Sequence, residues 1–381
     1  MNNPLVALQQ HGQSVWLDYI RRNMLQSGGE LAKLIREDGL RGMTANPTIF
    51  QQAIAAGDDY DAAIEALIDK RTAPIQIYEA VVSNDIRHAC DLFAPVYEAT
   101  DGADGFVSLE VAPSLAHDTA GTIDEARRFW KMVDRPNLMI KVPGTEAGVP
   151  AVEQLLTDGL NINITLLFSL ENHERVAWAY IAALEQRLGD GKPIDRIASV
   201  ASFFVSRVDT LVDEQIEARL KTADGARRAT LEGLRGKAAI ANARLAYQSF
   251  KRIFGDERFG RLRERGARVQ RPLWASTSVK NKRYPELMYV ENLIGPDTVD
   301  TLPRETLEAF RDHGQPRHSI EEDVDGAHET MRALAEVGID YDGVTAQLEQ
   351  EGVEKFAKSF DDLIEGIAQK HEKLQAAVSS R

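Results

Sequence analysis

Residues 161–189 of the chain read NINITLLFSLENHERVAWAYIAALEQRLG. The segment Asn161–Phe168 is a short run of apolar and β-branched residues, which is typical of a strand. The segment Glu171–Arg187 has apolar residues three and four positions apart, which predicts a helix, and Gly189 is typical of the residue at which a helix ends. The stretch therefore predicts one β/α unit.

The alternation of strands and helices continues in both directions from this unit. Further helices are predicted around Leu31–Glu37 and Ile123–Val133. No glycine-rich dinucleotide loop or Walker loop follows any predicted strand, so a closed (β/α)8 TIM barrel is favoured over an open doubly wound sheet. The eight predicted strands are Ser14–Ile20, Arg41–Asn46, Phe106–Val111, Leu138–Val142, Asn161–Phe168, Ile197–Phe204, Pro272–Thr277 and Met288–Ile294.

Three helical stretches are longer than a minimal barrel needs. They lie at about 47–99, at about 206–266 and in the tail that follows Pro316. No internal repeat, low-complexity tract or linker rich in proline and glycine marks a domain boundary. We therefore expect residues 1–381 to form a single barrel domain with two helical insertions and a helical carboxy-terminal tail.

Charge and composition exclude several classes of function. The chain has 45 Lys and Arg against 59 Asp and Glu, and this formal net charge of -14 argues against a nucleic-acid or anionic-membrane partner. There is no run of about eighteen apolar residues and no signal-peptide pattern. The single cysteine, Cys90, excludes an intrachain disulfide. We expect a cytoplasmic protein that acts on small molecules, and its oligomeric state is left open.

Polar side chains fall at the carboxyl ends of nearly all predicted strands, which is where a β/α barrel builds its active site. No histidine is among them, and the eight histidines of the chain show no metal-ligand spacing, so we expect neither a metal nor another cofactor. The polar residues at the strand ends are Asp18, Thr44, Asn46, Glu110, Lys141, Asn163, Thr165, Ser202 and Ser276.

A lysine beside carboxylic acids, carboxamides and hydroxyls suits imine chemistry on a polyhydroxylated carbonyl compound. The amine of Lys141 must be neutral to attack a ketone, and its apolar neighbours in the strand favour the neutral form. Each residue also has a plainer interpretation. Lys141 could be a solvated lysine, Glu110 and Asp18 could be edge charges or helix caps, and Asn163 with Thr165 could be a satisfied polar pair. For Lys141 the pattern alone favours the functional interpretation, because a lysine between apolar strand residues is unusual. For the other residues only their convergence at one mouth favours an active site.

Several segments resemble the signature segments of transaldolases. They span residues 14 to 294, each lies at a predicted strand, and the last of them resembles the longer bacterial subgroup of that family. The segments are Thr44-Ala-Asn46-Pro47, the Lys141 strand, Asn163-Ile-Thr165-Leu-Leu-Phe-Ser169, Ser202-Phe-Phe204-Val-Ser-Arg207, and Trp274-Ala-Ser-Thr277 with Lys280-Asn281.

The resemblance implies a TIM barrel of the class I aldolase type. It implies that this barrel transfers a dihydroxyacetone unit between sedoheptulose 7-phosphate and glyceraldehyde 3-phosphate in the pentose phosphate pathway. It implies that Lys141 forms the Schiff base and that Glu110 acts as acid and base through a water held by Thr165. Asp18 would take and return the proton of the hydroxyl beside the breaking bond.

The resemblance also implies which residues bind the substrate. Hydroxyls of the dihydroxyacetone unit would be held by Asn46, Asn163 and Ser202, and Thr44 has a less defined role in the same place. The phosphate would be anchored by Arg207 and Ser276. Many transaldolases have an arginine two residues after the matching serine, but here Ser278 occupies that position, so Lys280 is predicted to be the second phosphate cation.

Two rival functions remain open at this point. One is a fructose-6-phosphate aldolase type of lyase, which would release free dihydroxyacetone, and the other is a non-catalytic barrel that only binds sugar phosphates. Phe204 bears on the first rival, because the smaller aldolase relatives of transaldolases carry tyrosine at the matching position. An apolar ring cannot orient a water molecule, so Phe204 is predicted to protect the enamine from protonation.

Overall fold

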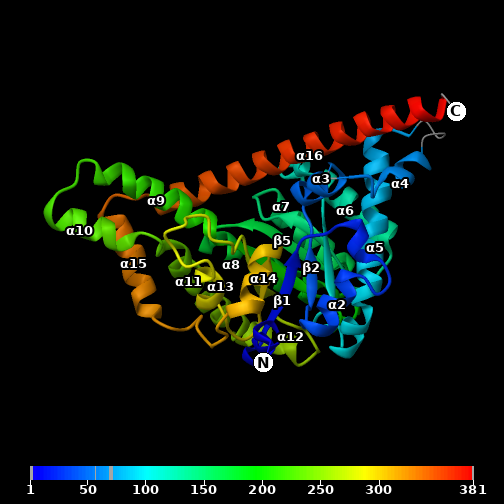
Figure 1. Ribbon diagram of the computed structural model, residues 1–381. Helices are drawn as coiled ribbons and strands as arrows, with labels where there is room; N and C mark the ends of the chain where they lie inside the picture. The colour runs from blue at the N-terminus through cyan, green and yellow to red at the C-terminus, as the bar shows by residue number, and fades with distance from the viewer. Residues whose placement is uncertain (1–2, 56, 68–71, 380–381) are drawn as a thin grey trace.

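The protein is described by a computed structural model that covers residues 3–55, 57–67 and 72–379. Eight parallel strands, each paired with the next, close into a barrel in the order β1-β2-β3-β4-β5-β6-β7-β8, which confirms the predicted (β/α)8 fold (Figure 1). The strands are β1 Gln13–Asp18, β2 Gly42–Thr44, β3 Phe106–Glu110, β4 Leu138–Pro143, β5 Ile162–Leu167, β6 Ser199–Phe204, β7 Arg271–Ala275 and β8 Thr298–Leu302.

The predicted eighth strand is wrong. Residues Met288–Asn292 form a helix, α13, whose side chains Tyr289 and Val290 are buried, and the eighth strand is Thr298–Leu302. A short apolar run such as the one at 288–294 fits a buried helix as well as a strand, and periodicity cannot separate the two. The true strand contains Asp300 between threonine and valine residues, so its composition looks less strand-like than its neighbour's.

Helices cover the outside of the barrel, and one long helix, α16, crosses the side of it that faces upward in Figure 1. Among the described helices, none has the length and apolar character needed to cross a membrane. The helices are α1 Pro4–Ala7, η1 Leu8–His11, η2 Arg22–Leu25, α2 Glu30–Glu37, α3 Pro47–Ala55, α4 Asp61–Glu65, α5 Pro74–Ala99, η4 Pro113–Leu115, α6 Thr119–Val133, α7 Gly148–Asp158, α8 Leu170–Gly189, α9 Ser206–Leu220, α10 Gly225–Leu234, α11 Ala238–Phe254, α12 Glu257–Arg263, α13 Met288–Asn292, α14 Arg304–His313, α15 Val324–Glu336 and α16 Tyr341–Ser379.

The three helical additions expected from the sequence correspond to α3–α5, α9–α12 and α15–α16. Residues 56 and 68–71, within the first of these stretches, and residues 1–2 and 380–381 at the two ends lie outside the described residues. The division of the chain into one domain stays a prediction.

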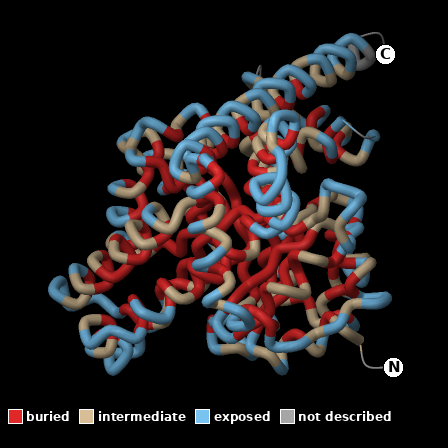
Figure 2. Tube along the Cα trace, turned by 90° about the vertical axis from the view of Figure 1, so that its left-hand side faces the viewer, coloured by how far each residue is buried: buried red, intermediate tan, exposed pale blue. Residues whose placement is uncertain are grey.

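Buried residues concentrate along the strands and on the inner faces of the helices (Figure 2). Inside the barrel, the Trp16 indole packs over Gly42, its partner on β2, where an added Cβ would come within 2.5 Å of the ring. Side chains two apart on a strand share a face, so Asp18 lies on the same inner face, one layer nearer the carboxyl end. A large aromatic ring therefore fills the interior below the layer of polar residues.

Candidate active site

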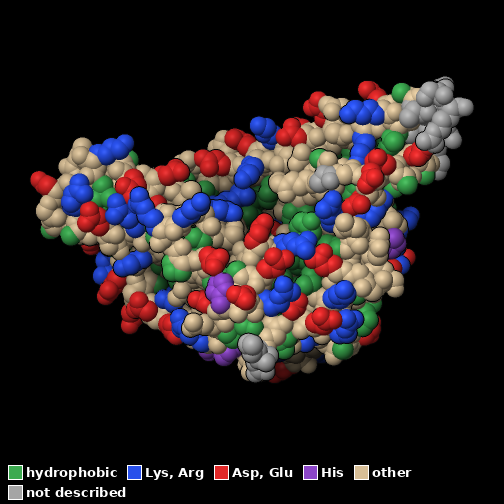
Figure 3. Space-filling model, in the orientation of Figure 1, with side chains coloured by type: hydrophobic (Ala, Val, Ile, Leu, Met, Phe, Trp, Pro, Cys, Tyr) green, Lys and Arg blue, Asp and Glu red, His purple; other side chains and the backbone are tan. Residues whose placement is uncertain are grey.

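A cavity of about 480 Å³ opens at the carboxyl ends of the strands, beneath α16. The hollow is visible below α16 in the space-filling view, with basic and acidic side chains around it (Figure 3). Glu110 and Asn163 are buried next to the residues that line it. Of the residues predicted from sequence, those that line the cavity are Asp18, Thr44, Asn46, Lys141, Thr165, Ser202, Phe204, Arg207, Ser276 and Lys280.

Lys141, which lines the cavity, pairs with the buried carboxylate of Glu110. Glu110 on β3 and Lys141 on β4 are partners in the strand register, and Lys141 Nζ lies 3.1 Å from Glu110 Oε2. The two side chains are only 5% and 3% exposed. Burial raises the pKa of Glu110, while the positive charge of Lys141 acts in the opposite direction. A carboxyl group in such a setting can hold a proton or release it to its neighbour.

Asp18, which is half-buried, is the second acid of the site. Thr44 Oγ1 donates a hydrogen bond to Asp18 Oδ1 at 2.7 Å and lies 2.7 Å from the hydroxyl of Thr301 on β8. Burial raises the pKa of Asp18, and Lys141 and the hydrogen bond from Thr44 lower it in part. Thr301 was missed because the eighth strand was placed too early in the sequence.

A hydrogen-bonded chain fixes the amide of Asn163. Ser202 Oγ donates to Asn163 Oδ1 at 2.6 Å, and Asn163 Nδ2 donates to Ser108 Oγ at 3.0 Å. Asn163 is fully buried, so Ser202 presents the end of this chain to the cavity. The amide is therefore held at both ends by protein atoms.

Thr165 lies two residues after Asn163 on β5 and faces the cavity. Its hydroxyl is buried and has no hydrogen-bond partner among the described side chains. Buried hydroxyls in proteins nearly always bind protein, water or ligand. Thr165 is thus the inner polar group best placed to hold a small molecule.

Two predicted binding residues also have structural contacts. The side-chain oxygen of Asn46 accepts a hydrogen bond of 3.0 Å from the backbone N–H of Ile49 at the start of α3. Ser276 Oγ lies 2.9 Å from Ser206 Oγ, and Ser276 has a left-handed backbone with φ of 57°. A serine in that conformation is uncommon, and such strain often accompanies a functional position.

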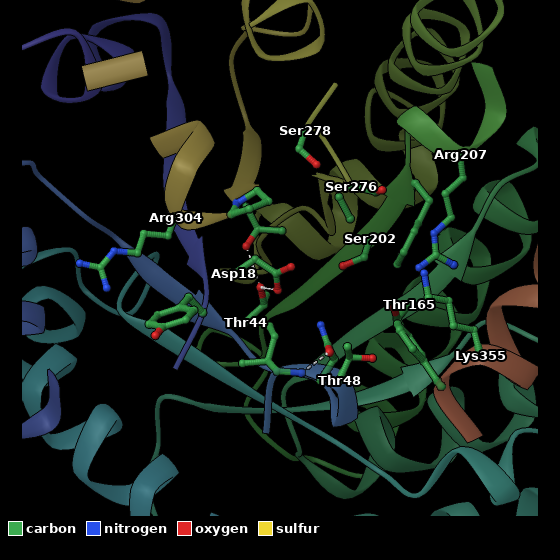
Figure 4. Close-up of a pocket in the computed structure, with 18 of the residues that line it drawn as sticks. Asp18, Thr44, Thr48, Thr165, Ser202, Arg207, Ser276, Ser278, Arg304 and Lys355 are labelled. Atoms are coloured by element: carbon green, nitrogen blue, oxygen red, sulfur yellow. Dashed lines mark hydrogen bonds between the residues drawn. The ribbon is translucent and has the colours of Figure 1, made fainter. Parts of the chain in front are cut away.

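Aromatic rings surround Arg207 at the outer part of the cavity. The guanidinium carbon of Arg207 lies 5.2 Å from the centre of the Phe204 ring and 5.8 Å from that of Phe356. Phe204 also contacts Phe168, with ring centres 5.3 Å apart. Lys280 is exposed and donates to Ser278 Oγ at 2.6 Å. Figure 4 shows Arg207 reaching into the cavity.

Sequence reasoning missed the contribution of the carboxy-terminal helix. Lys355 and Phe356 of α16 line the cavity from the side opposite the barrel floor, and the Phe356 ring lies 5.7 Å from Lys141 Nζ. No local motif marks these residues, because they belong to an ordinary helix more than two hundred positions away from Lys141 in the sequence. Lys355 and Phe356 reach the cavity only because α16 runs across the mouth of the barrel.

Comparison with known proteins finds one protein family that matches this chain. The profile of the transaldolase/fructose-6-phosphate aldolase family matches residues 15–367. The chain belongs to this family. It is 48% identical to the transaldolase of Trichodesmium erythraeum over 98% of this chain and 99% of that protein. It is 49% identical to transaldolase 2 of Nostoc punctiforme over 97% of both, and 48% identical to the transaldolase of Mycolicibacterium smegmatis over 96% of both.

Family membership makes the chain an enzyme, and transaldolases are transferases. Its activity is that of a transaldolase, the Schiff-base transfer of a dihydroxyacetone unit between sugar phosphates. Among the described residues, no group of three or more His, Cys, Asp or Glu side chains is placed to hold a metal ion. The roles of the individual residues in this cavity, and the expected independence from metals, stay predictions.

Proposed function

We propose that this cavity transfers a dihydroxyacetone unit from sedoheptulose 7-phosphate to glyceraldehyde 3-phosphate through a Schiff base on Lys141, giving erythrose 4-phosphate and fructose 6-phosphate. The observation that supports this most directly is the 3.1 Å contact between Lys141 Nζ and Glu110 Oε2. Lys141 lines the cavity, and both side chains are almost fully buried. A buried lysine beside a buried acid has the groups that imine formation needs.

In the first half of the reaction, Lys141 attacks the ketone carbon of the donor. Burial raises the pKa of Glu110, so its carboxyl group is suited to accept the ammonium proton and to deliver a proton to the departing hydroxyl, which leaves as water. The product is a protonated imine between Lys141 and the sugar. We assign to Thr165 the water through which these protons pass, since its buried hydroxyl has no protein partner among the described residues.

In the second step, the carbon–carbon bond next to the imine breaks. Asp18 accepts the proton of the hydroxyl on the carbon that becomes the aldehyde, and the bonding electrons move into the imine to give an enamine. The acceptor aldehyde then reacts in the reverse sense, and Asp18 returns the proton to the new alcohol. Thr44 orients Asp18 through its 2.7 Å hydrogen bond.

The remaining polar groups would position the substrate. Asn46 and Ser202 line the cavity and would hold hydroxyls of the three-carbon unit, while Asn163 would act mainly by fixing Ser202. Arg207 and Ser276 would bind the phosphate at the outer end. We further propose that the enzyme acts in the cytoplasm, which its one buried cysteine and net charge of -14 support.

Borohydride reduction in the presence of fructose 6-phosphate tests this function. We expect a covalent three-carbon adduct on Lys141, identified by peptide mass spectrometry, and transfer of the unit when glyceraldehyde 3-phosphate is added. Absence of an adduct would indicate a barrel that only binds sugar phosphates. An adduct accompanied by rapid release of dihydroxyacetone without acceptor would indicate an aldolase.

A further inference from the structure

The carboxy-terminal helix forms a fixed part of the cavity. Phe356 is buried, with its ring 5.7 Å from Lys141 Nζ and 5.8 Å from the guanidinium carbon of Arg207. The ring therefore lies between the reacting lysine and the outer arginine. Because Lys355 is the preceding residue on the same helix, the anchoring of Phe356 also fixes where the Lys355 backbone stands.

Gly352, one turn earlier, lets α16 approach this closely. A Cβ added at Gly352 would come within 2.8 Å of Leu166 Cδ2 and within 3.6 Å of Arg207 Nη1. The first distance is too short for a real contact, and it involves the side chain of a residue on the barrel wall. The helix is thus seated directly against β5 and Arg207, so its position at the mouth is defined by close packing.

Lys355 lies among cations. The charge of Arg207 and, more weakly, that of Lys280 lower the pKa of Lys355, and partial burial acts in the same direction. In Figure 4 the side chains of Arg207 and Lys355 point toward each other on one side of the cavity. The negative charges of Glu110, Asp18 and Glu351 act on Arg207 and oppose the lowering of its pKa by burial. Among the described residues, however, no carboxylate forms an ion pair with Arg207, Lys280 or Lys355.

Arg304 provides the contrast within the same cavity. It lies on the other side in Figure 4 and is neutralised by Glu30 at 2.6 Å and Glu308 at 3.1 Å. Like charges that face one another without acids raise the free energy of the empty site, and a bound anion removes that cost. The cluster of Arg207, Lys280 and Lys355, called here the rim cations, is therefore suited to a doubly charged phosphate, whereas Arg304 is not.

We propose that Lys355, supplied by the carboxy-terminal helix, is the second cation that binds the substrate phosphate with Arg207, and that Lys280 contributes less. Both lysines are exposed, but Lys280 already donates a hydrogen bond to Ser278 Oγ. Lys355 faces Arg207 directly and follows a packed turn of helix. A bound sugar phosphate would then join the barrel wall to α16. This inference rests on the proposed function, because it presumes that the phosphate lies at the outer end of the cavity.

The test compares charge removal at three lysines. Lys355→Met and Lys280→Met each remove one rim cation and keep the length of the side chain. Lys358→Met is the matched control, since Lys358 lies on the same helix, is exposed and does not line the cavity. With fructose 6-phosphate kept saturating for each variant, transfer is measured to erythrose 4-phosphate and to unphosphorylated erythrose.

Lys355→Met should raise KM for erythrose 4-phosphate by about tenfold, the size of one charge-assisted contact, with little change in kcat and none in KM for erythrose. Inhibition by inorganic phosphate should weaken in parallel, and Lys355→Arg should restore both. Lys280→Met should have a smaller effect, and Lys358→Met none.

Several outcomes would overturn the inference. If Lys355→Met impairs both acceptors alike, the residue has a structural role, and if Lys280→Met has the larger effect, the loop carries the second cation. The role of Lys355 would be refuted if the Lys355→Met variant prefers erythrose 4-phosphate over erythrose as strongly as the parent enzyme does. That outcome would leave the proposed function intact. A parent that transfers to both acceptors equally well would refute the phosphate site and the role of Lys355, whereas a parent that transfers to neither acceptor would refute the proposed function.

Discussion

The two ends of the barrel use the same residue types in opposite ways. At the amino-terminal end, Arg271 on β7 bonds Asp104 at 2.9 Å, Ser14 Oγ on β1 at 2.6 Å and the backbone oxygen of Thr298 on β8 at 2.9 Å. Ser14 Oγ in turn donates to Asp104 at 2.6 Å. This small network ties three parts of the barrel together, and each of its side chains is bonded to another.

At the carboxyl end, comparable groups lack such partners. The Thr165 hydroxyl is buried without a hydrogen bond to the described protein. Glu110, Asp18 and Glu351 lie near Arg207, but no carboxylate of the described residues forms an ion pair with any of the rim cations. Unsatisfied polar groups cost stability, and at the carboxyl end a bound ligand can satisfy them. The comparison shows that the Arg271 network is complete without a ligand. Thr165 and the rim cations at the carboxyl end, where a β/α barrel carries its active site, offer contacts that a ligand can complete.

The largest expected effect is at Lys141. Lys141→Ala should abolish transfer because no other group can form the imine, while the barrel should stay folded since the change opens no large apolar cavity. Transfer is measured with glyceraldehyde 3-phosphate as acceptor, and folding by circular dichroism and thermal unfolding. More than trace activity in a folded variant would contradict the mechanism.

Glu110→Gln should slow imine formation and hydrolysis by about 10²–10⁴-fold, the usual size of general acid–base catalysis. Burial raises the pKa of Glu110, so its limb in the pH profile of kcat/KM should lie above the range of an exposed glutamate and should vanish in the variant. Single-turnover trapping across pH measures both. An unchanged rate and profile would assign Glu110 a structural role.

Arg271→Ala should have the reverse consequence, a loss of stability with normal chemistry. Removing a partly buried arginine that binds Asp104, Ser14 and Thr298 should lower the free energy of unfolding by about 2 kcal/mol, while kcat stays unchanged. Urea unfolding and steady-state transfer are compared with Arg261→Ala, in which the arginine is exposed. A loss of kcat without loss of stability would show that the two ends are not separate in this way.

The smallest effect is expected at Phe204, where a substitution should change how the enamine divides between protonation and transfer to an acceptor. Phe204→Tyr would place a phenolic hydroxyl in the cavity, where it could hold a water and assist protonation of the enamine. Dihydroxyacetone release from fructose 6-phosphate without acceptor should rise several-fold, on the order of a few tenths to one kcal/mol in barrier, with some loss of transfer. If a correctly folded variant shows no increase, the transferase preference is set by other residues.

The amino-acid sequence determined the barrel and ten of the 22 residues that line the cavity. Alternating strands and helices lead to a parallel closed sheet. Because a β/α barrel has its active site at the carboxyl ends of its strands, the sequence alone placed Lys141, Asp18, Thr44 and Ser202 at one mouth. That step needs only local periodicity, because neighbouring strands bring their ends together whatever the detailed packing. It failed at the eighth strand, where a buried helix and a strand have the same local pattern, and Thr301 was lost with it.

The tertiary structure decided the rest: it removed one predicted residue from the cavity surface and added residues that the sequence did not predict. It buried Asn163 behind Ser202, since hydrogen bonds to Ser108 and Ser202 hold the amide below the surface. It also brought Lys355 and Phe356 to the mouth, which no pattern in the tail predicts. That placement depends on the fit of Gly352 against Leu166, a contact between segments almost two hundred residues apart, and helical periodicity gives the face of a helix but not the surface on which that face will pack.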